Sequence, residues 1–363
     1  MLSFNDFVVL WASENDPSEN NVPYDAVEAV LTDGAADVIY QDATEVNIEP
    51  VGAMVGGNTR RGSNDGKRQA FIRQMCNVSI TVPLRAFAGA GEAPFYDPIL
   101  QAGNLEPEID GASVVYTKKT RNTPAMTVYK IYRDLLSDDW RLRIATGVRG
   151  NITFNINVDE EPTITFEGTG QYSDLTAPAE FIDPDTGQIA LLKDGTTPIT
   201  ARTTGTFNQV DQDPMTCTNI DGTIDDGDGF DAAILFQTLD MDLGFGVADL
   251  TPVQGETTRR RGILTRGQGE TTTGSASVVD YDPAFLTEVV AGITESKEYA
   301  LAIGLRNGQG SIDIAAPKMQ LLREAEADNS GTIQYDIPYR LNGDWGARAT
   351  ADNELTITYD VIA

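Results

Sequence analysis

A chain of 363 residues is longer than a typical single domain and long enough for two hydrophobic cores. Its 26 Lys and Arg residues against 55 Asp and Glu give a formal net charge of −29, which disfavours a surface that attracts nucleic-acid backbones. Histidine is absent from the sequence. This excludes the commonest general base, the Ser–His and Cys–His nucleophile pairs and the usual zinc ligands, so we expect a protein that is not an enzyme.

The two cysteines, Cys76 and Cys217, lie far apart in different sequence contexts. Neither a disulfide framework nor a thiolate metal site is predicted, and both cysteines are expected to be small core residues. No apolar run approaches the roughly 18 residues that span a bilayer, and the first residues lack a basic signal-peptide region. We expect synthesis in the cytoplasm, no membrane association and no cofactor.

Residues 1–45 open with a short apolar run over 7–11 and continue with turn-forming residues. This composition predicts an extended leader that is tethered at one end only. Alternating apolar residues over 46–55 and 76–82 then predict a β-hairpin with a long polar loop. The loop contains a local basic cluster, which includes Arg60 and Arg61.

A short helix is predicted after this hairpin, because Asp97 precedes Pro98 and an apolar run that ends at Gly103. Asp97 is expected to be the N-cap, with the proline in the first helical position. Alternation then predicts four strands before a Pro-, Thr- and Asp-rich linker over 176–213, where we place the domain boundary. These strands are expected over residues 127–133, 141–145, 150–158 and 163–172.

The second half repeats this order of parts. A hairpin over 241–247 and 275–279 encloses a polar loop with Arg259, Arg260 and Arg261, and a helix over 284–291 is expected to end at Gly292. Alternating strands are then predicted over residues 310–321, 331–339 and 353–359.

The repeated order predicts a tandem duplication. Gly62 and Gly262 in the two arginine loops are 200 residues apart, and Tyr96 and Tyr281 before the two helices are 185 residues apart. One gap of about fifteen residues reconciles the two spacings, as expected of a repeat that has drifted. The predicted fold is mainly β, with two tandem antiparallel β-sandwich or barrel domains, each with a short flanking α-helix and a long hairpin arm. The domains are expected over residues 46–175 and 214–363.

An acidic stretch over residues 221–231 is the only metal-like cluster in the sequence. A calcium loop of the EF-hand type needs glycine at its sixth position, where a frame that starts at Asp221 has Asp226. A frame that starts at Asp226 has Phe230 at its fifth position. We therefore predict a solvated hairpin turn, with a weak cation site as the alternative.

The paired arginines of the two loops are the candidate interaction residues. They could bind phosphate, but the net charge and the absence of stacking aromatic residues in the loops argue against nucleic acid. A basic arm and an acidic body are complementary, so contact between arm and body in successive copies is preferred, and simply solvated arginines remain an alternative. The residues concerned are Arg60, Arg61, Arg259, Arg260 and Arg261.

Several stretches resemble the tail tube (major tail) proteins of long-tailed bacteriophages. Residues 147–152 (GVRGNI) and 164–172 (ITFEGTGQY) are similar to the GxRGxxxF and F-x-G-x-Y hairpin of that family. Residues 236–244 (FQTLDMDLG) are similar to its F-x-LDLG strand, and residues 314–318 and 353–357 to its closing strands.

This resemblance implies a structural virion protein whose subunits form rings that stack into a hollow tube for genome ejection. The hairpin arm would reach a neighbouring ring, and tape-measure, tail-terminator and distal tail proteins would be further partners. DNA would be present only in transit, and an acidic lumen would not retain it. If each half fills one place of a six-fold ring, three chains form a pseudo-hexameric ring, with a hexamer of chains as the alternative.

Two other classes remain open from the sequence. A secreted or surface β-sandwich adhesin that binds glycan would be a monomer with an aromatic-lined pocket. An enzyme that uses carboxylates alone is the third class, although adjacent pairs such as Asp138–Asp139 do not mark a general acid and base.

Overall fold

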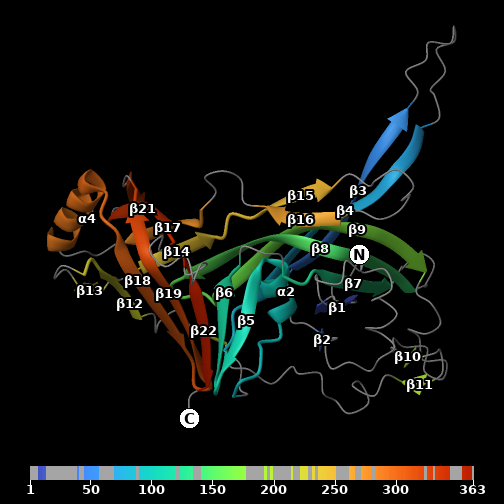
Figure 1. The fold of residues 1–363 in the computed structure, drawn as a ribbon, viewed down its shortest axis with the longest axis horizontal. Coiled ribbons are helices and arrows are strands. Elements are labelled where there is room, and N and C mark those ends of the chain that lie inside the picture. The colour runs from blue at the N-terminus through green and yellow to red at the C-terminus, as the bar shows by residue number, and fades with distance from the viewer. Residues whose placement is uncertain are drawn as a thin grey trace, which may run out of the picture.

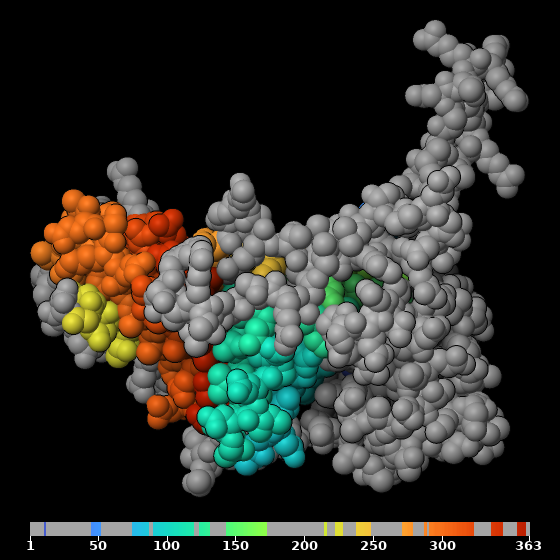
Figure 2. All heavy atoms as spheres, viewed as in Figure 1, coloured from blue at the N-terminus to red at the C-terminus, as the bar shows by residue number. Residues whose placement is uncertain are grey.

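The structure is a computed structural model that describes part of the chain. Figure 2 draws in grey the residues whose side chains the structure does not describe, which include parts of several strands. The described residues are 7–13, 39–40, 45–56, 69–86, 90–119, 123–133, 140–176, 192–193, 197–198, 214–215, 221–227, 231–233, 236–250, 261–265, 271–278, 283–322, 325–329, 332–343 and 354–361.

The fold is mainly β, and most strands belong to one large antiparallel sheet that is not closed (Figure 1). Two short ladders stand apart from it. One pairs β10 (Leu192–Lys193) with β11 (Thr197–Pro198), and the other pairs β15 (Gly246–Leu250) with β16 (Arg261–Thr265). The described helices are α2 (Asp97–Ala102) and α4 (Pro283–Glu295).

The first half of the chain contributes one ordered set of strands. These are β1 (Phe7–Ser13), β2 (Ile39–Tyr40), β3 (Glu45–Gly56), β4 (Gln69–Pro83), β7 (Met126–Arg133), β8 (Trp140–Asn157) and β9 (Thr163–Thr176). Neighbours in the sheet follow the order β2–β1–β7–β8–β9–β4–β3, and every pair is antiparallel.

The second half contributes a set with the same order. Its strands are β12 (Asp221–Asp225), β13 (Asp231–Ala233), β14 (Phe236–Asp242), β17 (Thr273–Val278), β18 (Tyr299–Arg306), β19 (Gly310–Leu321) and β21 (Thr332–Leu341). They pair as β13–β12–β18–β19–β21–β17–β14, again all antiparallel. The corresponding strands also follow one another in the same order along the chain. α2 lies between β4 and β7, and α4 lies between the corresponding strands β17 and β18.

A local irregularity recurs at the same place in both sets. The ladder between β7 and β8 shifts register between Met126 and Val128, the first and third residues of β7. The ladder between β18 and β19 shifts between Tyr299 and Leu301, the first and third residues of β18. A β-bulge is a specific local feature of one strand pair, so the similarity of the two sets extends beyond strand order.

The two halves share one sheet, so the prediction of two separate sandwiches or barrels is not confirmed. β14 of the second half pairs with β8 of the first, from Thr238 opposite Asn157 to Asp242 opposite Thr153. β22 (Thr356–Val361) pairs with β6 (Ser113–Lys118), which is itself paired with β5 (Leu105–Asp110). Period-2 alternation identifies strands but does not report which strands become neighbours.

Alternating burial explains why these segments form strands. Along β9, Ile164 and Phe166 are fully buried, whereas Glu167 between Phe166 and Gly168 is exposed. This arrangement matches a sheet with one face in the core and one face in solvent. The apolar side of α2 packs into the same core through Ile99 and Leu100, and the helix contacts β1, β5, β7 and β8.

Most strand predictions are confirmed, including the first hairpin as β3 with β4 and the closing strands as β19, β21 and β22. The strands expected over 141–145 and 150–158 are one strand, β8, because β9 pairs along it through a register shift between Thr146 and Arg149. The predicted strand over 241–247 is divided instead. Gly244, with a φ of 71°, lies in the turn that separates β14 from β15.

Both helix boundaries differ in detail from the prediction. The N-cap of α2 is Tyr96 without a side-chain cap, because the Asp97 carboxylate accepts hydrogen bonds from Gln101 (2.6 Å) and Tyr116 (2.7 Å) instead. Gly103 is the C-cap, as expected. Gly292 does not end α4, which continues to Glu295. A Cβ at Gly292 would lie 1.9 Å from the Tyr299 hydroxyl, so this glycine admits the tyrosine ring against the helix.

Part of the expected leader is a sheet strand rather than a free extension. β1 pairs with β7 along its whole length, and Trp11 is fully buried with its indole N–H donating to the Phe95 carbonyl (3.3 Å). Within the expected linker over 176–213, Thr176 is the last residue of β9, and the other described residues form the short β10–β11 ladder. The acidic stretch is a hairpin, as predicted, because β12 pairs with β13 from Thr223 to Asp225.

Candidate assembly arm and its anchor

The arm of the second hairpin is itself a two-stranded ladder. It leaves the sheet after β14, runs out along β15, returns along β16 and rejoins the sheet at β17 (Figure 1). Leu250 opposite Arg261 is the outermost described pair. Both arm strands contact β8, so the arm of the second half extends along the sheet of the first half.

The structure places one of the predicted interaction residues. The backbone of Arg261 opens β16. Arg259 and Arg260 precede it in the loop between the arm strands, and Arg60 and Arg61 belong to the loop between β3 and β4, all four outside the described residues. The two arginine groups therefore belong to the two corresponding hairpins of the repeated strand order, as the sequence predicts.

The outgoing end of the arm is fixed by a tight turn over residues 243–245. The Asp242 carboxylate accepts hydrogen bonds from the Gly244 N–H (2.8 Å) and from Asn151 Nδ2 (2.5 Å). The Asn151 side-chain oxygen in turn accepts the N–H of Phe245 (2.9 Å). Because Asn151 lies on β8, this network ties the departure of the arm to the first half of the chain.

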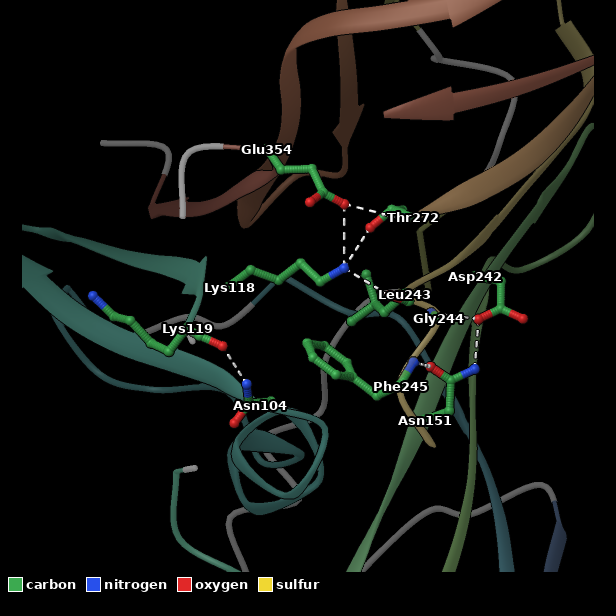
Figure 3. Close-up of polar contacts among 10 residues, drawn as sticks. All are labelled: Asn104, Lys118, Lys119, Asn151, Asp242, Leu243, Gly244, Phe245, Thr272 and Glu354. Atoms are coloured by element: carbon green, nitrogen blue, oxygen red, sulfur yellow. Dashed lines mark hydrogen bonds and ion pairs between the residues drawn. The ribbon is translucent and has the colours of Figure 1, made fainter. Parts of the chain in front are cut away.

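A buried lysine holds both ends of the arm together (Figure 3). Lys118, at the end of β6, donates through Nζ to the carbonyl oxygen of Leu243 (2.6 Å) and to Thr272 Oγ1 (2.6 Å). Leu243 leads into the arm and Thr272 leads out of it. A third contact joins Lys118 Nζ to Glu354 Oε1 at 3.2 Å, just before β22.

The hydrogen-bond donors of the Lys118 ammonium group all find acceptors. An ammonium group has three N–H donors, and Lys118 has three acceptors within hydrogen-bonding distance. Its side chain is only 3% exposed and that of Glu354 6%, so solvent screens the pair little. Glu354 also accepts the backbone N–H of Thr272 (3.0 Å), and the Phe245 ring lies 4.6 Å from Lys118 Nζ in a cation–π contact.

Sequence reasoning missed the anchor, although β6 carries a signal for it. Val114, Tyr116 and Lys118 occupy alternate positions, and all three are buried. Lys119 occupies the other face and makes an ion pair with Glu106 (3.0 Å) that is about one third exposed. A lysine in phase with buried apolar residues indicates a paired charge in the core, since an unpaired one would be costly.

The described residues contain no group of three or more His, Cys, Asp or Glu side chains that could hold a metal ion. Within the same part of the chain, no helix is long and apolar enough to cross a membrane. No family model matches the chain, and no curated protein shows significant similarity to it. Function therefore has to be inferred from the fold, the arm and the charge.

Proposed function

We propose that this chain is a structural virion protein, the subunit of a bacteriophage tail tube whose rings stack around a channel for the genome. The observation that carries the proposal is the doubled strand set, with the same sheet order and the same bulge in both halves. The halves already join through the strand pair β14–β8. A unit that joins a copy of itself by strand pairing has the kind of contact from which a ring can be built.

The two strand sets are proposed to be tandem tail-tube-like domains joined by the linker over residues 176–213. β1 and β2 correspond in pairing to β12 and β13, so we assign them to the first domain, which then begins before the boundary expected at residue 46. Within the part of the chain that the structure describes, each domain has one helix, and each has a hairpin whose loop contains the arginines. With two equivalent domains in each chain, three chains fill a six-fold ring.

The charge of the chain fits a conduit for DNA. A formal charge of −29 per copy repels a polyanion, and a repelled duplex passes through a channel without being held. The arginine loops are the exception in this acidic chain. We propose that the arm between β14 and β17 directs its arginines to an acidic surface of the next ring, where attraction would set the stacking register.

Anchoring supports this role for the arm. Both of its ends are held by one buried side chain, Lys118, and its outgoing turn is fixed by Asp242 and Asn151. Ordering a contact element before it binds reduces the entropy lost on assembly. An arm that is held at its base can therefore present its loop in a defined direction.

Electron microscopy of the purified protein tests the proposal. We expect rings, or tubes of stacked rings with a central channel, across a range of salt and protein concentrations. Monomers that persist under all of these conditions would contradict it. Such monomers would leave a binding role, such as that of a glycan-binding adhesin, as the alternative to examine with glycan arrays.

A further inference from the structure

Two strands at opposite ends of the molecule each have one edge that no described strand occupies. β3 pairs with β4 on one side only. β20 (Ala325–Asn329) follows β19 and pairs with β21 on one side only. Figure 1 shows β3 and β21, the strand with which β20 pairs, toward opposite ends of the long axis.

The unpaired edge of β20 corresponds to the edge of β8 that pairs with β14. β9 pairs along one edge of β8, so β7 and β14 must share the other, with β7 at the start of the strand and β14 at its end. In the second half, β22 and β21 together line one edge of β19 and β20, and β18 lies along β19 on the other edge. The place that β14 takes on β8 is therefore left open on β20.

The edge of β3 corresponds to the edge of β14 that fills that place. β3 and β14 are the matching first strands of the two hairpins, paired with β4 and β17 respectively. β14 uses its second edge for β8, whereas no described strand pairs with the second edge of β3, where side chains of the same chain bond the backbone instead. Lys130 Nζ donates to the Val46 carbonyl oxygen (2.7 Å) and an Arg143 N–H donates to that of Ile48 (3.3 Å), so pairing with another strand would replace these bonds. Each chain thus carries one donor edge and one acceptor edge of a contact that it already makes once internally.

We propose that β3 of one copy pairs antiparallel with β20 of the next, which repeats between chains the β14–β8 contact made within each chain. This inference rests on the ring of the proposed function and names the surfaces that close it. The contact is head to tail, and a head-to-tail contact closes into a ring when its rotation divides a full turn. The internal and external contacts would then alternate around the ring.

The alternation of buried residues suggests a register for the new contact. Val46 and Ile48 are buried on β3, as Leu239 and Met241 are on β14, which places exposed Asn47 at the position of Asp240. Asp240 is opposite Asn155 near the end of β8. Asn47 should accordingly lie opposite a residue of β20 in the neighbouring copy.

Disulfide cross-linking tests this pairing. Asn47→Cys is combined with one cysteine at a time at positions 325 to 329, and the assembled protein is oxidised and run on a non-reducing gel. Directly opposite residues have Cβ atoms about 4.5–5.5 Å apart, close to what a disulfide spans, and residues two positions away are about 7–8 Å apart. We expect a ladder of linked chains, up to a closed trimer, at one position, with weak or no linkage at the others.

Glu108→Cys is the matched control, combined with the same β20 cysteines. Glu108 is exposed on β5, another strand that pairs on one side only among those described, but β5 has no counterpart of the β14–β8 contact. Linkage of Asn47→Cys but not of Glu108→Cys supports the proposed edge. Rings that form normally without linkage at any of the five positions would overturn it and leave the tube function intact. If the unmodified protein forms no rings at all, the proposed function fails first.

Discussion

Replacement of Lys118 by Met tests whether the buried anchor stabilises the base of the arm. Methionine keeps much of the side-chain volume but removes the ammonium group that bonds Leu243 O, Thr272 Oγ1 and Glu354 Oε1. Glu354 then stays in the core with its negative charge but without the ammonium group that balances it, although it still accepts the Thr272 N–H. Removing one member of a buried pair costs about 3–5 kcal/mol, which is a large share of the roughly 5–15 kcal/mol that stabilises a domain.

A double-mutant cycle isolates the pair. Glu354→Gln keeps an oxygen acceptor for Thr272 but removes the charge that faces Lys118, so we expect it to cost about 1–3 kcal/mol. Lys118→Met together with Glu354→Gln leaves no buried charge. The double variant should therefore lose less stability than the sum of the single variants, with a coupling energy of about 1–3 kcal/mol.

Urea unfolding monitored by tryptophan fluorescence measures these free energies, and Lys119→Met supplies the control. Lys119 is adjacent in sequence, but its pair with Glu106 is about one third exposed, so its loss should cost less than about 1 kcal/mol. Equal effects of Lys118→Met and Lys119→Met, or strictly additive single variants, would refute the reasoning about the anchor.

Three further predictions concern the turn, the buried tyrosines and the arm. Gly244→Ala should destabilise the protein more than Gly111→Ala in thermal unfolding. Both glycines have a φ near +70°, but only at Gly244 would an added Cβ meet a backbone oxygen, at 2.9 Å. Equal losses of stability in the two variants would contradict this. Burial raises the pKa of both Tyr96 and Tyr359, so above about pH 10 these hydroxyls lose their protons more readily in the unfolded chain than in the folded one. The free energy of unfolding should therefore be unaffected by them below about pH 10 and fall as the pH rises above it. An unchanged urea midpoint up to about pH 11 would count against this. Serine in place of the three arginines at 259–261 should leave circular dichroism and rings unchanged but impair stacking in electron micrographs, and normal tubes would refute that role for the arm.

Alternation made the strands predictable where the two faces of a strand differ in burial. β9 is an example, since Ile164 and Phe166 alternate with polar residues and the strand was expected over 163–172, from its observed start to four residues before its end. β5 escaped prediction because its sequence, LEPEID, is acidic and exposed toward its end. β18 escaped although Tyr299, Leu301 and Ile303 are buried at alternate positions, so its signal was present but was not used.

The pairing of strands was beyond local pattern, and the local signal for the anchor on β6 was not used. Repetition of parts along the sequence indicated two matching hairpins, but not that β14 would pair with β8 of the other half. That contact joins residues far apart in the chain, and no local propensity encodes it. The arginines of the arm were found because charge in an acidic chain is conspicuous, whereas Lys118 was missed because a lysine normally marks the solvent face of a strand.

The number of chains in one ring tests the central claim most directly. If the two halves are equivalent domains that together fill a six-fold ring, native mass spectrometry of isolated rings should give three times the chain mass of 39.2 kDa. Rings of six chains would contradict the claim that each chain supplies two of the six positions.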